Sequence, residues 1–183
     1  YDVETPKHRQ GLRPSQIPTR TIAFSRWENG IENGHIELAC VSLLSTDGVT
    51  HFYSEYEAKQ IADLCRKLLT YPNILKIGHN AGQFDRLNAE ANFGITPTPL
   101  IDTILPARAA NPSIPKGLKP TGRTYCDVGE WDSDDKEESI ATGSTNDDEL
   151  LKYNGTDTQV NLKIWPELRR LAAATGYFLP IRK

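Results

Sequence analysis

Three short segments carry acidic residues at spacings that would let their carboxylates act together. The first contains Asp2, Val3 and Glu4. Side chains alternate between the two faces of an extended strand, so Asp2 and Glu4 are expected on one face and Val3 on the other. Two carboxylates on one face repel each other unless a cation binds between them, and Mg²⁺ or Mn²⁺ prefers such oxygen ligands. Alone, the pair is weak evidence for a metal site, because solvated strand edges carry the same pattern.

The second segment, residues 78–85, follows an apolar stretch and opens a helix. Asp85 falls in the first helical turn, where the helix dipole favours a carboxylate, and the ring of Phe84 can anchor the helix on a sheet. A dipole partner would explain Asp85 alone. It leaves His79 and Asn80 unexplained at the carboxyl end of a strand, where sites in α/β sheets form.

The third segment places Tyr153 and Asp157 four residues apart, on one face of a helix. The same face continues through Leu150, Val160, Ile164, Leu168 and Leu171. Asp157 therefore interrupts an apolar stripe, and a buried carboxylate needs a metal or a basic partner because an unpaired buried charge is costly. The alternative is a polar residue satisfied near the start of the stripe.

Hydrophobic patterning predicts the elements that would position these segments. The predicted strands are 1–5, 21–27, 35–44, 49–53 and 74–77, with turns at 28–30, 32–34 and 47–48. The predicted helices are 55–70, 83–92, 102–110 and a long final helix from about residue 147. Gly94 should end the second helix, and Pro166 should kink or restart the last one. This order predicts one α/β sheet with helices packed on it.

Composition fits one domain of 183 residues with 38% hydrophobic content and no membrane-length apolar run. Cys40, Cys65 and Cys126 are odd in number and widely spaced, which favours neither a disulfide framework nor a metal site. We therefore expect the cytoplasm or another reducing compartment. The chain starts at Tyr1, has no methionine and shows no signal-like stretch, which indicates a domain cut from a longer polypeptide.

Charge is unevenly distributed. Residues 127–149 hold ten acidic residues and one lysine, a net charge of −9, whereas the remaining residues carry a net charge of +6. The basic part is suited to phosphate. Residues 132–146 have almost no apolar side chains, so we expect a flexible acidic loop within the domain.

In order, YDVET, HNAGQFD and YNGTD resemble the three exonuclease motifs of the DEDDy group in the DnaQ-like, RNase H-fold superfamily. The likeness is greatest to proofreading domains of family-A DNA polymerases of phage and bacterial type. It extends over essentially the whole chain, including an Ile-Asp-Thr-Ile segment after the second motif. The resemblance implies an RNase H-like mixed β-sheet flanked by α-helices.

The resemblance also implies a function: metal-dependent 3′–5′ hydrolysis of single-stranded DNA to nucleoside 5′-monophosphates, in proofreading. Two divalent ions, Mg²⁺ or Mn²⁺, would be required, together with a polymerase domain in the same or a partner chain. The implied metal ligands are Asp2, Glu4, Asp85 and Asp157, and Tyr153 would orient the attacking water. Residues implied to contact the terminal nucleotide are Thr5, Asn80 and Phe84. No membrane partner is expected.

Relative to the family, residues 7–35 look like an insertion. Its basic residues are Lys7, Arg9, Arg13 and Arg20. They suit either a DNA-contacting arm or a basic loop without function. Two other functions remain open. An RNase D-like exoribonuclease uses the same carboxylates on RNA, and no motif here reports how the site treats a 2′-hydroxyl. A catalytically silent nucleic-acid-binding module would keep the fold, although the presence of all five motif residues argues against it.

Overall fold

The computed structural model describes residues 1–4, 13, 21–28, 31–39, 58–128 and 147–176. Several sequence predictions lie outside these residues. They are the strand 49–53, the acidic loop 132–146, Thr5, and most of the insertion 7–35, including Lys7, Arg9 and Arg20.

The first sheet is antiparallel, with strand order β1 (Asp2–Glu4), β2 (Thr21–Glu28), β3 (Ile31–Ala39). Val3 pairs with Ile22, and both side chains are buried. This pairing gives β1 one face toward the core, as the alternation of its residues predicts.

The predicted turn at 32–34 is wrong, because these residues lie inside β3. Ser25 pairs with His35 and Trp27 with Glu32, so β3 has one residue more than β2 between these two pairs. The extra residue falls where Asn33 precedes glycine, and such bulges accept residues that are otherwise typical of turns.

The second sheet consists of two parallel strands, β4 (Lys76–Gly78) and β5 (Leu100–Asp102). The main-chain nitrogen of Tyr1 donates a hydrogen bond to the carbonyl of Ile77 (2.8 Å), which places the start of β1 beside β4. Parallel and antiparallel strands therefore adjoin, and the mixed α/β class predicted from the sequence is confirmed.

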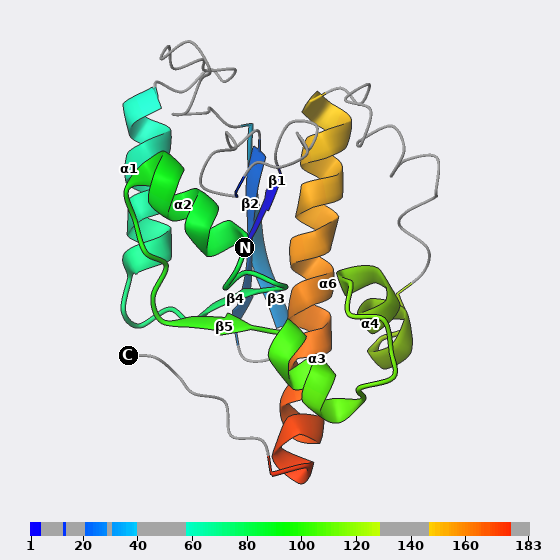
Figure 1. Ribbon diagram of the computed structural model, residues 1–183. Coiled ribbons are helices and arrows are strands. Elements are labelled where there is room, and N and C mark those ends of the chain that lie inside the picture. Colours follow the sequence, from blue (N-terminus) through cyan, green and yellow to red (C-terminus); the bar gives the residue numbers. More distant parts are fainter. Residues whose placement is uncertain (5–12, 14–20, 29–30, 40–57, 129–146, 177–183) are drawn as a thin grey trace.

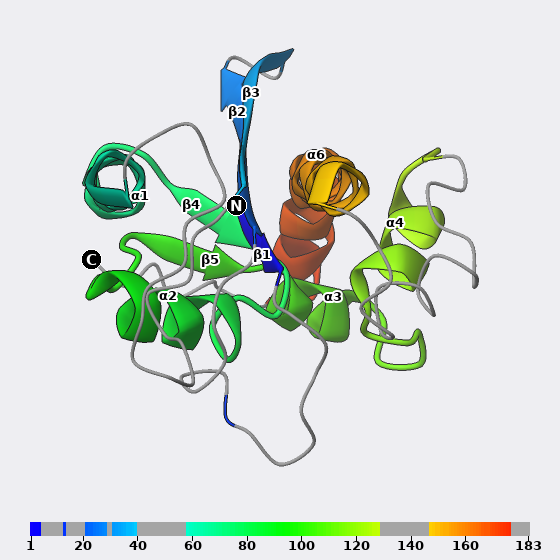
Figure 2. The same ribbon diagram turned by 90° about the horizontal axis from the view of Figure 1, so that it is seen from above.

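Five helices are described. They are α1 (Ala58–Thr70), α2 (Asp85–Phe93), α3 (Ile104–Ala110), α4 (Leu118–Tyr125) and α6 (Asp147–Ala174). Figures 1 and 2 show α1 and α2 on one side of the strands and α6 on the other, with α4 beyond α6. Helix α6 packs against all three strands of the antiparallel sheet, and also against β4, α3 and α4. Within the described residues, no helix combines the length and apolarity needed to cross a bilayer.

The helices differ from the predictions at three places. Asp102 ends β5 instead of beginning a helix, and α4 was not predicted, because its eight residues include a proline and a glycine. Helix α6 is continuous through Pro166, so it does not restart there. A proline inside a helix costs about 3 kcal/mol. Ile164 and Leu168, on either side of it, are fully buried, and this packing outweighs that cost.

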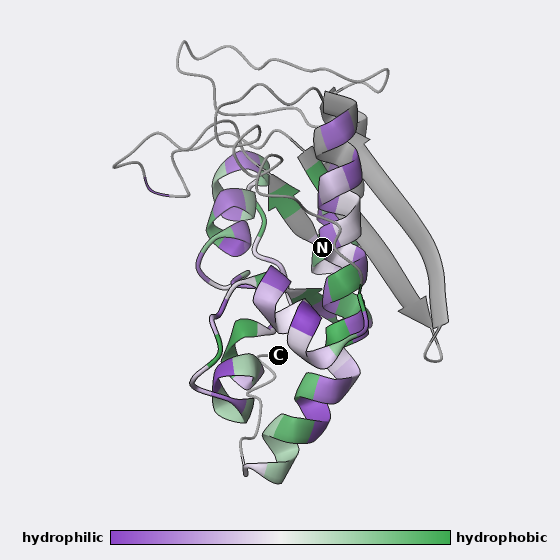
Figure 3. Cartoon of the chain, turned by 90° about the vertical axis from the view of Figure 1, so that its right-hand side faces the viewer, coloured by the Kyte–Doolittle hydropathy of each residue, from purple (hydrophilic) through white to green (hydrophobic). Residues whose placement is uncertain are grey.

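The buried apolar residues form two clusters. One joins β1, β2, α1 and α2 through Tyr1, Val3, Ile22, Cys65, Leu69, Ala81, Ala89, Phe93 and Ile95. The other joins α3 and α6 through Ala107, Val160, Ile164 and Leu168, with residues of α4 packed against it. Figure 3 shows that the helices on this side carry both hydrophilic and hydrophobic residues, as expected of helices that cover a core.

Lys76 of β4 is a buried cation, with 5% of its surface exposed. Its ammonium group donates to the carbonyls of Tyr71, Ile74 (2.8 Å) and Thr98 (2.7 Å). One side chain therefore holds the turn before β4 to the loop before β5.

Lys76→Met is expected to lower the free energy of unfolding by about 2–3 kcal/mol, since three carbonyl oxygens lose their donor together. Urea denaturation measures the change. Lys67→Met, at an exposed position on α1, is the matched control and should change stability little. Equal denaturation midpoints for the two variants would contradict the structural role of Lys76.

Candidate active site

The turn between β4 and α2 has a shape that dictates its residues. A Cβ on Gly78 would lie 2.5 Å from the Cβ of Ala81, which no side chain tolerates. Asn80 adopts φ 59°, a left-handed conformation that asparagine enters more readily than most residues. Its carbonyl accepts hydrogen bonds from the main-chain nitrogens of Gln83 and Phe84 (3.2 and 3.1 Å). The HNAGQFD segment is thus a tight turn that delivers the chain into α2.

Asp85, the first residue of α2, is 3% exposed. Its Oδ1 accepts a hydrogen bond from the main-chain nitrogen of Val3 (2.9 Å), so the carboxylate lies against β1 between Asp2 and Glu4. Burial raises the pKa of Asp85 to about 7. The nearby carboxylate of Asp102 adds to this rise.

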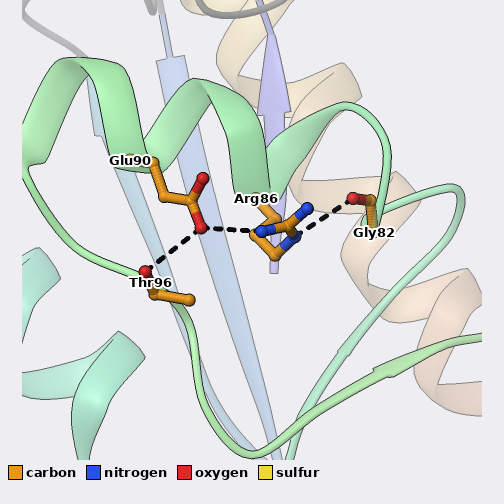
Figure 4. A network of polar contacts seen from close by, with 4 residues as sticks. All are labelled: Gly82, Arg86, Glu90 and Thr96. Carbon is orange, nitrogen blue, oxygen red and sulfur yellow. Dashed lines mark hydrogen bonds and ion pairs between the residues drawn. The ribbon is translucent and has the colours of Figure 1, made fainter.

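Around Asp85, side-chain contacts fix the first turns of α2 (Figure 4). Arg86 donates to the Gly82 carbonyl (3.2 Å) and pairs with Glu90 (2.8 Å), which also accepts from Thr96 (3.1 Å). The turn before α2 and the loop after it are therefore fastened to the same helix. This fastening limits how far Asp85 can move away from β1.

Strand β1 supplies the positions of Asp2 and Glu4. Asp2 pairs with Ala23 and Glu4 with Thr21, while the side chain of Val3 points into the core. The side chains of Asp2 and Glu4 themselves lie outside the described part of the chain.

Helix α6, which carries the third acidic segment, packs against β1. Asp157 is 7% exposed, and it lies on the same helix face as the buried residues Val160 and Ile164. The prediction of a carboxylate on the buried side of this helix is therefore confirmed. Tyr153 is partly buried, and the ammonium of Lys119 on α4 lies 5.4 Å from the centre of its ring. A cation at this distance is attracted to the ring face.

A buried polar cluster beside these residues was not predicted. His79 Nδ1 lies 2.9 Å from Thr103 Oγ1, and His79 Nε2 lies 2.6 Å from the carbonyl of Lys116. Thr103 Oγ1 also lies 2.8 Å from Oδ1 of Asn161, on α6. Burial lowers the pKa of His79, although the Lys116 carbonyl and Asp102 favour its protonated form. The sequence signals were His79 itself, a polar residue after a strand, and the Ile-Asp-Thr-Ile segment, which contains Thr103.

Asp102 accepts two main-chain hydrogen bonds in the same region. Its Oδ2 accepts from the Gly82 nitrogen (2.9 Å) and its Oδ1 from the Ile104 nitrogen (3.1 Å). It therefore joins the turn before α2 to the start of α3.

The donor chemistry of the site suits a hard divalent cation. Asp85 and Asp157 are buried carboxylates, and the hydrogen bond from Val3 engages only one oxygen of Asp85. Buried carboxylates favour a cationic partner, and oxygen ligands favour Mg²⁺ or Mn²⁺. Among the described side chains, which exclude Asp2 and Glu4, no group of three acidic, histidine or cysteine residues could hold a metal ion.

Three residues are expected to contact a nucleotide, and two of them are described. Thr5 lies outside the described residues. Asn80 is exposed, and its left-handed backbone gives a local reason for its identity. Phe84 is partly buried and directly precedes Asp85.

Comparison with known proteins gives one match. A family model described as 3′–5′ exonuclease matches residues 35–172, about three quarters of the 183 residues. The matched segment includes Asp85, Tyr153 and Asp157, and it begins after Asp2 and Glu4. No curated protein and no solved structure matches the chain.

Proposed function

Because this chain belongs to the 3′–5′ exonuclease family of the family-A DNA polymerase type, we propose that it removes nucleotides successively from the 3′ end of single-stranded DNA in proofreading. Family membership makes it a nuclease, a phosphodiester hydrolase. The products would be nucleoside 5′-monophosphates. A polymerase domain, in the same chain or in a partner, would supply the 3′ ends.

One observation carries the proposal: Asp85 is buried against β1 by its bond to the nitrogen of Val3. Alternation along β1 puts Asp2 and Glu4 on the face opposite to Val3. Helix α6, with buried Asp157, packs against the same strand. Segments more than 150 residues apart in the sequence thus meet at one short strand.

In the proposed mechanism, Asp2, Glu4, Asp85 and Asp157 hold two divalent ions, Mg²⁺ or Mn²⁺. When bound, such ions lower the pKa of a coordinated water and stabilise the attacking and leaving oxygens of a phosphodiester displacement. The Tyr153 hydroxyl orients the attacking water. With an ordinary pKa near 10, a phenol is a poor base at neutral pH, so orientation is the role that suits it.

End-labelled single-stranded DNA and RNA of matched sequence, incubated with Mg²⁺, Mn²⁺ or EDTA, test the proposal. We expect a ladder that shortens from the 3′ end of DNA with either metal and stops in EDTA. Faster shortening of the RNA would replace the proposal with an exoribonuclease. Intact substrate in every metal would indicate a binding module.

Tyr153→Phe is expected to reduce turnover by about tenfold or more, because a misplaced water attacks less efficiently. The ring that Lys119 covers is retained, so binding of single-stranded DNA without metal should stay within about twofold of the parent. Single-turnover cleavage and fluorescence anisotropy separate the two effects.

Tyr125→Phe, on α4, is the matched control, since it removes a phenol outside the acidic cluster. Its turnover should equal that of the parent. Full activity of Tyr153→Phe would remove this hydroxyl from the mechanism.

A further inference from the structure

We propose that His79, Thr103 and Asn161 form a directional hydrogen-bonded chain that positions α6, and hence Asp157, relative to the turn that leads into Asp85. The proposal rests on the proposed function, because it gives these three residues a part in shaping the metal site. They are positioning residues, since the argument places none of them in contact with substrate.

The direction of the chain follows from the Lys116 carbonyl. A carbonyl only accepts, so His79 Nε2, 2.6 Å away, must carry a hydrogen and donate. In neutral histidine the other nitrogen, Nδ1, then lacks a hydrogen and accepts. Its partner at 2.9 Å is the Thr103 hydroxyl, which must therefore donate to it.

This direction decides the orientation of the Asn161 amide. The single hydroxyl hydrogen of Thr103 is used for His79, so it is not available for Asn161 Oδ1 at 2.8 Å. Within the described residues, Nδ2 of Asn161 is buried without a hydrogen-bond partner. Turning the amide by 180° exchanges these two atoms, so Nδ2 donates to Thr103 Oγ1 and loses its unpaired state.

In the resulting chain, Asn161 donates to Thr103, Thr103 donates to His79, and His79 donates to Lys116. The carbonyl of Gly78 needs no hydroxyl, because it accepts from the main-chain nitrogen of Thr103 at 2.9 Å. A protonated His79 would reverse the middle bond, and the hydroxyl hydrogen of Thr103 would then turn to the carbonyl of Gly78 at 3.3 Å.

The hydrogen-bonded chain connects elements whose relative positions shape the proposed site. Asn161 lies one helical turn beyond Asp157 on α6, and His79 belongs to the turn that delivers Asp85. At its other end, Lys116 precedes α4, whose Lys119 covers the Tyr153 ring. Thr103 and Asn161 are 0% and 1% exposed, so water cannot easily replace a lost bond.

Two measurements test the hydrogen-bonded chain. The first is the imidazole nitrogen NMR spectrum of the protein labelled in its histidines, with His79 assigned by comparison with His79→Gln. We expect neutral His79 with hydrogen on Nε2 at pH 7. A charged ring, or hydrogen on Nδ1, would overturn the direction proposed, and this readout does not depend on nuclease activity.

The second readout is Mn²⁺ binding, measured from the electron paramagnetic resonance of the free ion, alongside the Mn²⁺ dependence of cleavage. Thr103→Val keeps the shape but removes the hydroxyl, and it should weaken Mn²⁺ binding about tenfold or more, as loss of groups that orient metal ligands does. Thr103→Ser restores the hydroxyl and should restore most of the affinity.

Thr121→Val is the matched control, because Thr121 is also fully buried, and its hydroxyl donates to the Gly117 carbonyl (2.8 Å) outside the chain. It should change Mn²⁺ affinity by less than twofold. Equal affinity in Thr103→Val and the parent would overturn the positioning role. A parent that neither binds Mn²⁺ nor cleaves DNA would instead refute the proposed function, while the NMR result would still decide the direction of the chain.

Discussion

Asp157→Asn is expected to abolish exonuclease activity while the fold survives. If Asp157 is a metal ligand, its replacement removes a negative oxygen ligand from the centre of the reaction. Loss of groups that merely orient ligands costs about 10–100-fold, so loss of a ligand should exceed about 100-fold. Asparagine has nearly the same shape, and its amide carries no charge in a site that is 7% exposed. Thermal stability in EDTA should therefore stay close to that of the parent.

Cleavage of end-labelled DNA and circular dichroism melting measure these two expectations on one preparation. Asp127→Asn, which removes an exposed carboxylate, is the control and should cleave at the parental rate. Parental cleavage by folded Asp157→Asn would exclude this residue from the metal site.

The burial of Asp157 was predictable because helical periodicity needs only local sequence. The residues at its face repeat every three or four positions over several turns, and packing on the sheet confirms the periodicity. The end of α2 was predictable for a similar reason, since Gly94 adopts φ 66° and its nitrogen bonds to the carbonyl of Glu90. Both features are determined by residues that lie within a few positions of them in the sequence.

The errors arose where local signals competed with strand pairing. Asn33 and Gly34 have the composition of a turn, yet pairing with β2 absorbs them as an irregularity within β3. Asp102 continues into a helical pattern, but pairing of Gly78 with Asp102 makes it the end of β5. Neither partner can be identified from a window of neighbouring residues.

The buried polar cluster shows the same limit at the site. Thr103 lies 24 residues from His79 and 58 from Asn161, so no spacing rule connects them. The sequence marked His79 as a polar residue in need of an explanation. Its partners, Thr103 and the carbonyl of Lys116, come from the end of β5 and the segment before α4.

Asp85 connects the proposed metal site to stability because it is buried with its pKa raised to about 7. In the unfolded chain an aspartate has its pKa near 4. Between roughly pH 4 and pH 7, the folded protein therefore keeps a proton that the unfolded protein has released. Stability in metal-free buffer should fall as the pH rises through this window and stay low above it.

Asp85→Asn should remove that decline, because the amide stays neutral and its oxygen can still accept from the Val3 nitrogen. Above pH 7 without metal, the variant should be more stable than the parent by as much as roughly 4 kcal/mol, at about 1.4 kcal/mol per pKa unit. Near pH 4 the two should be alike. Saturating Mn²⁺ should stabilise the parent, since a ligand that binds only the folded state raises its stability, and should stabilise the variant much less. Urea denaturation at pH 4 and pH 8, with EDTA or Mn²⁺, measures all four conditions, and Asp63→Asn on α1 is the control. If Asp85→Asn loses as much metal-free stability between pH 4 and pH 8 as the parent and Asp63→Asn do, Asp85 is not a buried carboxylate held for a cation.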